Sequence, residues 1–367
     1  MTGRVEFAHM LRGIAALAVV IGHYFGTFFL SHEGIAKLLL VPPLPDLPKL
    51  TGPAAFIGDY GIIFGQFGVG IFFIISGFVV PFSLASGSVF KFIWRRALRI
   101  FPTYIFGFSI VMISIWLLTN YTGKAFTYSF EQIVSHWGIL TRGILGFGRI
   151  DGISWTLEIE LVFYIILAVV GKTIFVSGMR PLILAALFLA LASLASSQLA
   201  SMGYSNIVGN TSLQFWASLL LVIGLAYHAL FTGKIHTNEF YIIHAFVGLL
   251  IYLVWTFSNT KVYHWQWISG YVLAMIIFWL SYKIRERLKP SYILSHFADI
   301  SYPLYVVHAL SGYAIIYWSL SKGLGGILAI VIAFLSIYCL SVAIHYAVEK
   351  PLMQKRQSTI GLRPHIQ

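Results

Sequence analysis

The sequence is poor in cysteine and in charge. A single cysteine, Cys339, occurs among 367 residues, which excludes an intrachain disulfide and argues against a cysteine-based metal site. Charged residues make up only 10% of the chain, and 12 of them are acidic. Hydrophobic residues instead reach 59%, with a mean hydropathy of +0.85. This composition excludes an ordinary soluble domain and is typical of an integral membrane protein.

Long apolar runs recur along the whole chain, and about ten of them have the length of a membrane span. They cover residues 11–31, 61–82, 100–120, 154–171, 181–201, 212–232, 240–257, 265–283, 300–320 and 325–346. We therefore predict an all-α fold, a polytopic membrane helix bundle of about ten transmembrane helices over residues 1–350. Residues 351–367 would form a short cytoplasmic tail.

Lys and Arg outnumber Asp and Glu by 24 to 12, giving a formal net charge of +12. The basic residues gather in alternate loops, and the set that includes both ends of the chain carries more of them. By the positive-inside rule both termini of this multi-pass protein should be cytoplasmic. Basic helix ends favour membrane lipid as a partner, and without a soluble basic module we expect no nucleic acid.

Arg12 and His23 lie in the first apolar run. Eleven residues make about three helical turns, so the two side chains should share one helix face. Arg12 would lie near one membrane interface and His23 deep inside. Ionisable groups are costly in hydrocarbon and usually functional there, so this pair indicates the start of an active or transport site.

Glu160 lies on the fourth run at a depth that matches His23. Counted from opposite membrane surfaces, both residues fall about 9 Å below the outer boundary. A carboxylate in hydrogen-bonding range would orient the imidazole and raise its basicity. The alternative is that each polar residue finds a separate partner in the bundle.

Two further segments allow both a structural and a functional interpretation. Arg96 and Arg99 are three residues apart, so on a helix they could grip phosphates together or simply anchor the chain to anionic lipid. Small residues in segment 68–78 favour close helix packing, or else leave room for a slender substrate arm beside Ser76.

The ninth run opens with Ser301 to Tyr305 and carries His308 near the middle of the membrane. His308 is either a second polar group of the site or a hydrogen-bonding residue of the bundle. The remaining histidines show no metal-ligand spacing, so we expect no metal.

Taken together, these motifs are specific. The first part of the pattern consists of the Arg12–His23 pair, segment 72–78, and the Arg96–Arg99 pair followed by Pro102 and Tyr104. The second part consists of Ser154-Trp155-Thr156-Leu157 leading to Glu160, and of Ser301-Tyr302-Pro303-Leu304-Tyr305 leading to His308. Over most of its length the chain resembles the acyltransferase-3 family of membrane acyltransferases, which O-acetylate bacterial surface polysaccharides and some small molecules. The family often has a second acidic residue after the position of Glu160, where this chain has Leu161.

The resemblance implies a location in the bacterial inner membrane and roles for individual residues. His23 would be the catalytic histidine, Arg12 its essential companion, and Arg96 and Arg99 would bind the donor, usually a cytosolic acyl-CoA. We accordingly expect the catalytic residues to be His23, Arg12 and Glu160. The donor-binding residues would be Arg96, Arg99, Ser76 and Tyr104, and the further candidates are His308, Tyr305 and Trp155.

The expected function is O-acyl transfer. An acetyl group from cytosolic acetyl-CoA would move to a hydroxyl of a surface or lipid-linked glycan on the outer side, with His23 as general base. Two alternatives remain open. The chain could be a secondary transporter whose buried Arg, His and Glu form a relay, or an acyltransferase acting on a small molecule such as a macrolide.

Overall fold

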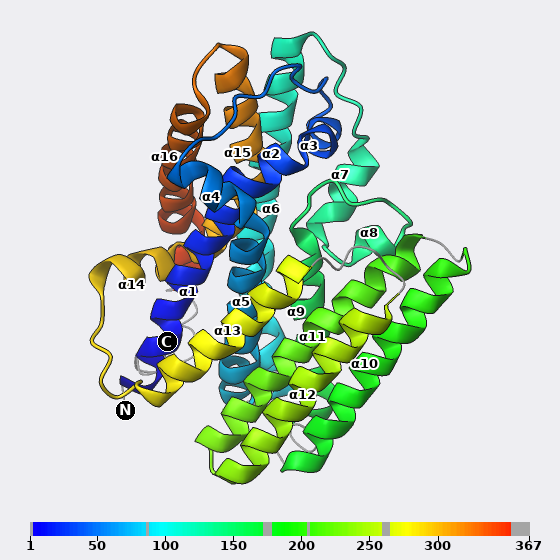
Figure 1. The fold of residues 1–367 in the computed structure, drawn as a ribbon, viewed down its shortest axis with the longest axis vertical. Helices are drawn as coiled ribbons and strands as arrows, with labels where there is room; N and C mark the ends of the chain where they lie inside the picture. The colour runs from blue at the N-terminus through cyan, green and yellow to red at the C-terminus, as the bar shows by residue number, and fades with distance from the viewer. Residues whose placement is uncertain (1–2, 86–87, 172–177, 204–205, 259–264, 354–367) are drawn as a thin grey trace. The chain divides into compact units, whose positions relative to one another are not determined.

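The computed structural model describes residues 3–85, 88–171, 178–203, 206–258 and 265–353, and in these residues the chain forms helices and no strand (Figure 1). The predicted all-α fold is therefore confirmed. The chain divides into two compact units. The first unit consists of Met1–Gly65, Arg96–Ser154 and Lys289–Gln367, and the second unit consists of Gln66–Arg95 and Trp155–Leu288.

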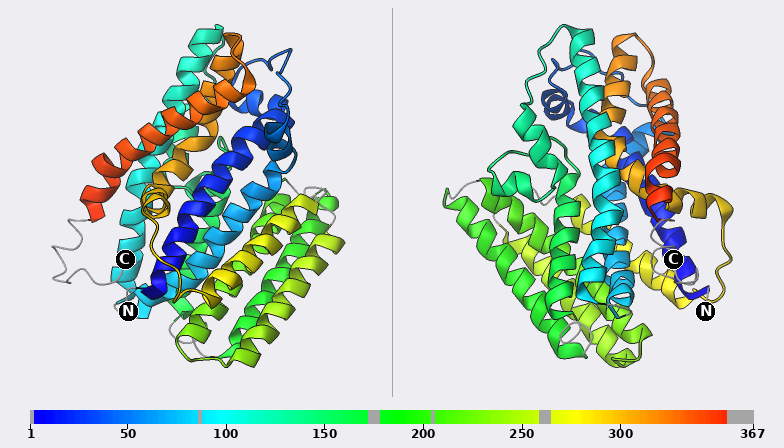
Figure 2. Two further views of the ribbon diagram at one scale, coloured as in Figure 1. Left: turned by 60° about the vertical axis from the view of Figure 1, so that its left-hand side comes forward. Right: turned by 180° about the vertical axis from the view of Figure 1, so that it is seen from behind.

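The first unit holds both ends of the described chain. Its elements are α1 (Gly3–Ile21), the π-helix η1 (Gly22–Thr27), α2 (Phe28–Leu30), α3 (His32–Leu38), α4 (Pro53–Asp59), most of α6 (Val89–Thr122), α7 (Phe130–Trp137), α8 (Thr141–Ile144), α14 (Tyr292–Asp299), α15 (Ser301–Ser321), α16 (Gly326–Ile344) and the π-helix η2 (His345–Glu349). α1 packs on α14 and α15, and α15 packs on α16 (Figure 2). α15 is buried over nearly its whole length, which places its polar residues inside this unit.

The second unit is built from longer helices. It contains most of α5 (Gly61–Ala85), together with α9 (Ser154–Val170), α10 (Met179–Ser201), α11 (Asn206–Phe231), α12 (Thr237–Phe257) and α13 (Trp265–Lys283). α10, α11 and α12 pack against one another (Figure 1). Gly77 of α5 and Gly224 of α11 meet backbone to backbone, because a methyl group on Gly224 would lie 2.7 Å from the Cα atom of Gly77.

Eight helices of the described chain are long and apolar enough to cross a membrane. They are Glu6–Leu30, Gly61–Leu84, Val89–Thr122, Met179–Ser201, Thr211–Phe231, Thr237–Phe257, Ser301–Ser321 and Gly326–Met353. Each of the ten predicted ranges is largely helical, but two do not meet this description. α9 has only 17 residues, and α13 carries Gln266 together with several tryptophan and tyrosine residues, which dilute its apolar character.

The last helix continues through Met353, beyond the predicted end of the bundle at residue 350. Most of the predicted tail, residues 354–367, lies outside the described residues.

Candidate active site

His23 lies on the π-helix η1, which follows α1 in the same continuous helix. Such a wide turn is rare and occurs frequently at functional sites. Gly22 and Gly26 pack directly on the backbone of Gly61, where a methyl group on Gly22 would lie 2.5 Å from the carbonyl oxygen. Small residues four apart are therefore what allow the turn that carries His23 to approach another helix so closely.

His23 is held by a tyrosine that the sequence patterns did not point to. Its Nδ1 lies 2.6 Å from the hydroxyl oxygen of Tyr313 on α15, and the two rings stack with centroids 5.9 Å apart. Tyr313 is five residues beyond His308, a separation that places the two on different helix faces under regular geometry. No spacing rule would have selected it.

His308 lies beside His23, with ring centroids 4.8 Å apart in an edge-to-face arrangement. The side chain of His308 is fully buried, and its Nδ1 lies 2.8 Å from the carbonyl oxygen of Tyr305. Since a carbonyl only accepts, Nδ1 carries the proton and Nε2 has the lone pair. Within the described part of the chain, Nε2 has no hydrogen-bond partner. His308 therefore makes a hydrogen bond within the bundle and also keeps a buried lone pair, so both interpretations of this residue stay predictions.

The tyrosines around these histidines fix the local backbone. The hydroxyl of Tyr24 donates to the carbonyl oxygen of His308 at 2.9 Å, and that of Tyr305 donates to the carbonyl of Ile153 at 3.3 Å. We call His23, His308, Tyr313, Tyr24 and Tyr305 the histidine–tyrosine cluster. It lies entirely within the first unit.

Glu160 has its own partners in the second unit. Ser76 of α5 donates to its Oε1 at 3.2 Å, and the hydroxyl of Tyr164, one helical turn further along α9, donates to the same oxygen. Ser76, expected beside the donor, and Glu160, expected beside the imidazole, are thus brought together. Glu160 and His23 belong to different units, so their pairing stays a prediction.

The other residues of α9 also have partners in the second unit. Glu158 is buried and accepts a hydrogen bond of 2.6 Å from Gln214, so it has a polar partner of its own. The ring of Trp155 lies among aromatic rings, with centroids 6.2 Å from Phe73 and 6.5 Å from Trp267.

Arg12, Arg96 and Arg99 lie on long helices. Arg12 is partly exposed on α1, as is His23 on η1, while the residues next to each of them in the sequence are buried. Arg96 and Arg99 are three residues apart on α6, as the helical interpretation requires; Arg96 is buried and Arg99 is partly exposed. α6 has 34 residues and is about 51 Å long, longer than a hydrocarbon core of about 30 Å, so one end can lie beyond the membrane.

Tyr104, expected near the donor, is fully buried, and its hydroxyl lies 3.5 Å from Oδ2 of Asp151. The other carboxylate oxygen of Asp151 accepts the backbone N–H of Ser154 at 3.0 Å, at the start of α9. Asp151 was not among the expected residues. Its position three residues before a helix start is the available signal, because Asp is a preferred helix-capping residue.

Two titratable groups that make contacts near the ends of the first membrane helix have shifted pKa values. Burial lowers the pKa of His32, whose Nε2 accepts the backbone N–H of Leu44 at 2.9 Å and so requires the neutral ring. The pKa of Asp299 is lowered by a hydrogen bond from His9, whose Nε2 lies 3.2 Å from Oδ1. The His32–Leu44 and His9–Asp299 contacts each connect another part of the chain to a residue near one end of the first membrane helix.

The helices and the cluster define an integral membrane protein that holds titratable side chains within an apolar helix bundle. Residues 5–346 match the family model described as an acyltransferase domain, and the chain belongs to the acyltransferase-3 family. A curated relative, Nodulation protein 10 of Rhizobium leguminosarum bv. viciae, is 32% identical over 124 residues, which cover 29% of this chain and 34% of that protein. The matched part thus spans about a third of that relative's length. No solved structure matches the chain.

Proposed function

We propose that the protein is a membrane O-acyltransferase that moves an acetyl group from cytosolic acetyl-CoA to a hydroxyl of a surface or lipid-linked glycan. Membership of the family supports acyl transfer by the multi-pass protein. The observation that carries the assignment is His23 itself, which is partly accessible on a π-helix, hydrogen-bonded to Tyr313 and adjacent to His308.

The hydrogen bond between Tyr313 and His23 restricts the tautomer of the His23 ring. If Nδ1 of His23 donates its proton to the hydroxyl oxygen of Tyr313, Nε2 of His23 carries the lone pair, which is the form that a general base requires.

In this proposal Nε2 of His23 removes the proton of the acceptor hydroxyl as the oxygen attacks the thioester carbonyl carbon. The new C–O bond forms, the C–S bond breaks, and the CoA thiolate leaves with the proton returned by the imidazolium. A general base of this kind contributes about 10²–10⁴ in rate. An acyl-histidine intermediate, in which Nε2 attacks first and the hydroxyl second, uses the same nitrogen.

The donor would bind from the cytoplasmic side. Arg96 and Arg99, three residues apart on α6, would hold the phosphates, since guanidinium groups bind phosphate oxygens in pairs. Ser76 and Glu160 share a hydrogen bond and would lie where the thioester arrives, with Glu160 orienting His23 and Arg12 as a companion cation. The acceptor would enter from the outer side.

The proposal is tested with His23→Ala. Membranes that contain the variant are supplied with radiolabelled acetyl-CoA, and label on the envelope glycan is counted. We expect a loss of about 10² or more, because the variant lacks the proposed general base. His296→Ala is the matched control; His296 lies on α14, where its ring bonds Tyr338, outside the histidine–tyrosine cluster.

Activity of His23→Ala within a few-fold of the wild type would reject the assignment. Uptake of a labelled solute without acyl transfer would favour the transporter alternative. Mass spectrometry of the cell envelope distinguishes the acceptors: one added acetyl per repeat unit supports a glycan, and an acetylated small molecule supports the macrolide-type alternative.

A further inference from the structure

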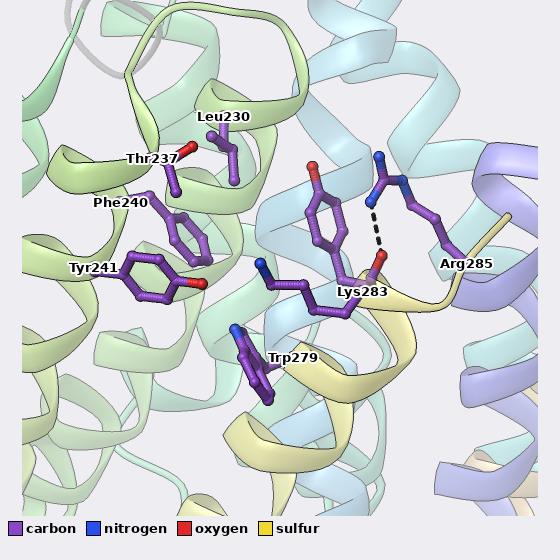
Figure 3. Close-up of a pocket in the computed structure, with 8 residues that line it drawn as sticks. Leu230, Thr237, Phe240, Tyr241, Trp279, Lys283 and Arg285 are labelled. Carbon is purple, nitrogen blue, oxygen red and sulfur yellow. Dashed lines mark hydrogen bonds between the residues drawn. The ribbon is translucent and has the colours of Figure 1, made fainter.

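A cavity of about 310 Å³ lies in the second unit, and none of its lining residues belongs to the candidate active site. It is lined by residues at the end of α11, the start of α12 and the end of α13, namely Leu230, Thr237, Phe240, Tyr241, Trp279, Tyr282, Lys283 and Arg285 (Figure 3). The lining combines aromatic rings with two cations and contains no carboxylate. This is the chemistry of a site for an anion that carries an apolar part.

Lys283 is the cation available to a ligand. Figure 3 shows its side chain extending toward Tyr241 and Trp279, and its Nζ lies 5.7 Å and 5.8 Å from the centres of those rings. No carboxylate in the described chain pairs with it. The aromatic rings therefore hold an ammonium group in place without neutralising it.

Arg285 adds a more constrained charge. Its guanidinium lies over the ring of Tyr282, 4.3 Å from the centroid, and Nη1 donates to the carbonyl oxygen of the same residue at 2.8 Å. Its carboxylate neighbour, Glu286, is largely exposed and 3.6 Å away, a weak surface pair. Arg285 thus keeps most of its attraction for an anion at the rim of the cavity.

The surface beside the cavity is apolar. Ile276 and Leu280 on α13 and Ile284, the residue after its last one, follow one another at four-residue spacing, and all three are exposed. Such a stripe is suited to contact with acyl chains. A soluble phosphate would make no use of it, whereas a phospholipid would place its head group in the cavity and its tails along the stripe.

We infer that this cavity binds the head group of an anionic phospholipid, with Lys283 contacting the phosphate. The volume agrees, since about 300 Å³ is the lower end of the range for small-molecule sites and matches a head group better than a whole nucleotide. Lys234, before α12, and Lys283 and Arg285, at and after the end of α13, also belong to the loops predicted to face the cytoplasm, where the membrane surface is negative. The inference does not depend on the proposed acyl transfer.

The experiment is native mass spectrometry of the full-length protein after exchange into mixed micelles of phosphatidylglycerol and phosphatidylcholine. We expect retained phosphatidylglycerol adducts in the wild type and about fivefold lower occupancy in Lys283→Ala, the factor for one basic residue at an anionic lipid surface. Arg287→Ala is the matched control, because it removes one exposed charge four residues away without touching the cavity. It should retain the adducts.

Three results would overturn the inference. One is wild-type occupancy in Lys283→Ala, and another is an equal loss in Arg287→Ala, which would show a general effect of charge. The third is displacement of phosphatidylglycerol by millimolar CoA or inorganic phosphate in a manner that requires Lys283. That outcome would assign the cavity to a soluble phosphate compound.

Discussion

Tyr313 offers the sharpest test at the level of single residues. Tyr313→Phe keeps the ring but removes the hydroxyl that lies 2.6 Å from Nδ1 of His23. Without that partner the imidazole populates both tautomers, and we expect kcat to fall about tenfold to a hundredfold with little change in KM. The fold should lose about 1 kcal/mol, the value of one hydrogen bond. Steady-state kinetics in membranes, with kcat and KM separated, measure the effect.

The control for this variant is Tyr338→Phe, which removes a hydroxyl bonded to a histidine outside the cluster, His296. It should leave kcat unchanged. A Tyr313→Phe enzyme with normal kcat, or one affected only in KM, would show that Tyr313 packs against His23 without setting its protonation.

From the sequence alone, candidate site residues can be identified only where a charge in a membrane span is energetically costly or where the spacing of residues follows a helical pattern. A charge in an apolar run is costly, and that cost singled out Arg12, His23, Glu160 and His308. Tyr313 carries no such mark, because tyrosine is common in membrane helices. Asp151 carries only the signal of a helix-capping residue, which does not indicate a contact with Tyr104. Their roles depend on which helices meet, and that is tertiary information.

At the level of elements, Gly77 decides between the two interpretations of the small-residue segment on α5. A side chain there would collide with the backbone of α11 at Leu221 and Gly224, so packing is the role that the structure supports at this position. We expect Gly77→Val to lower the free energy of unfolding by about 1–3 kcal/mol through overpacking. Thermal unfolding of the purified protein, followed by loss of monodispersity, measures this.

Gly248→Val on α12 is the matched control, since a Cβ atom at that glycine meets nothing within 4 Å. Equal melting temperatures for the two variants would exclude close packing as the reason for Gly77. A stable Gly77→Val protein with no activity would instead favour the interpretation that the small residues of this segment leave room for a substrate arm.

The helices themselves were predictable where apolar runs are long, since length and hydropathy suffice. The π-helix η1 was not. It depends on Gly22 and Gly26 meeting Gly61, a contact between segments that are 35 or more residues apart, and no local pattern shows which glycines will meet. The turn that carries His23 is therefore one that no local sequence pattern predicted.

For the whole molecule, the predicted number of spans was larger than the number of helices that meet the description of a membrane span. About ten were expected and eight are found in the described chain, because α9 is short and α13 is rich in polar and aromatic residues. Eight spans and the ten predicted spans are both even numbers, so either number is consistent with both termini on the same side of the membrane. Sidedness thus rests on the distribution of Lys and Arg, and it can be tested directly.

The test uses Cys339→Ser as a cysteine-free background. In spheroplasts, Lys124→Cys, after α6, should react with a membrane-impermeant maleimide, while Lys289→Cys, between α13 and α14, should react only after permeabilisation; both positions are exposed. The reason is that basic residues are more frequent in the loops that share a side with Lys289. The opposite labelling pattern would place Arg96 and Arg99 away from cytosolic CoA. The proposed route of the donor would then fail, even if His23 proved essential.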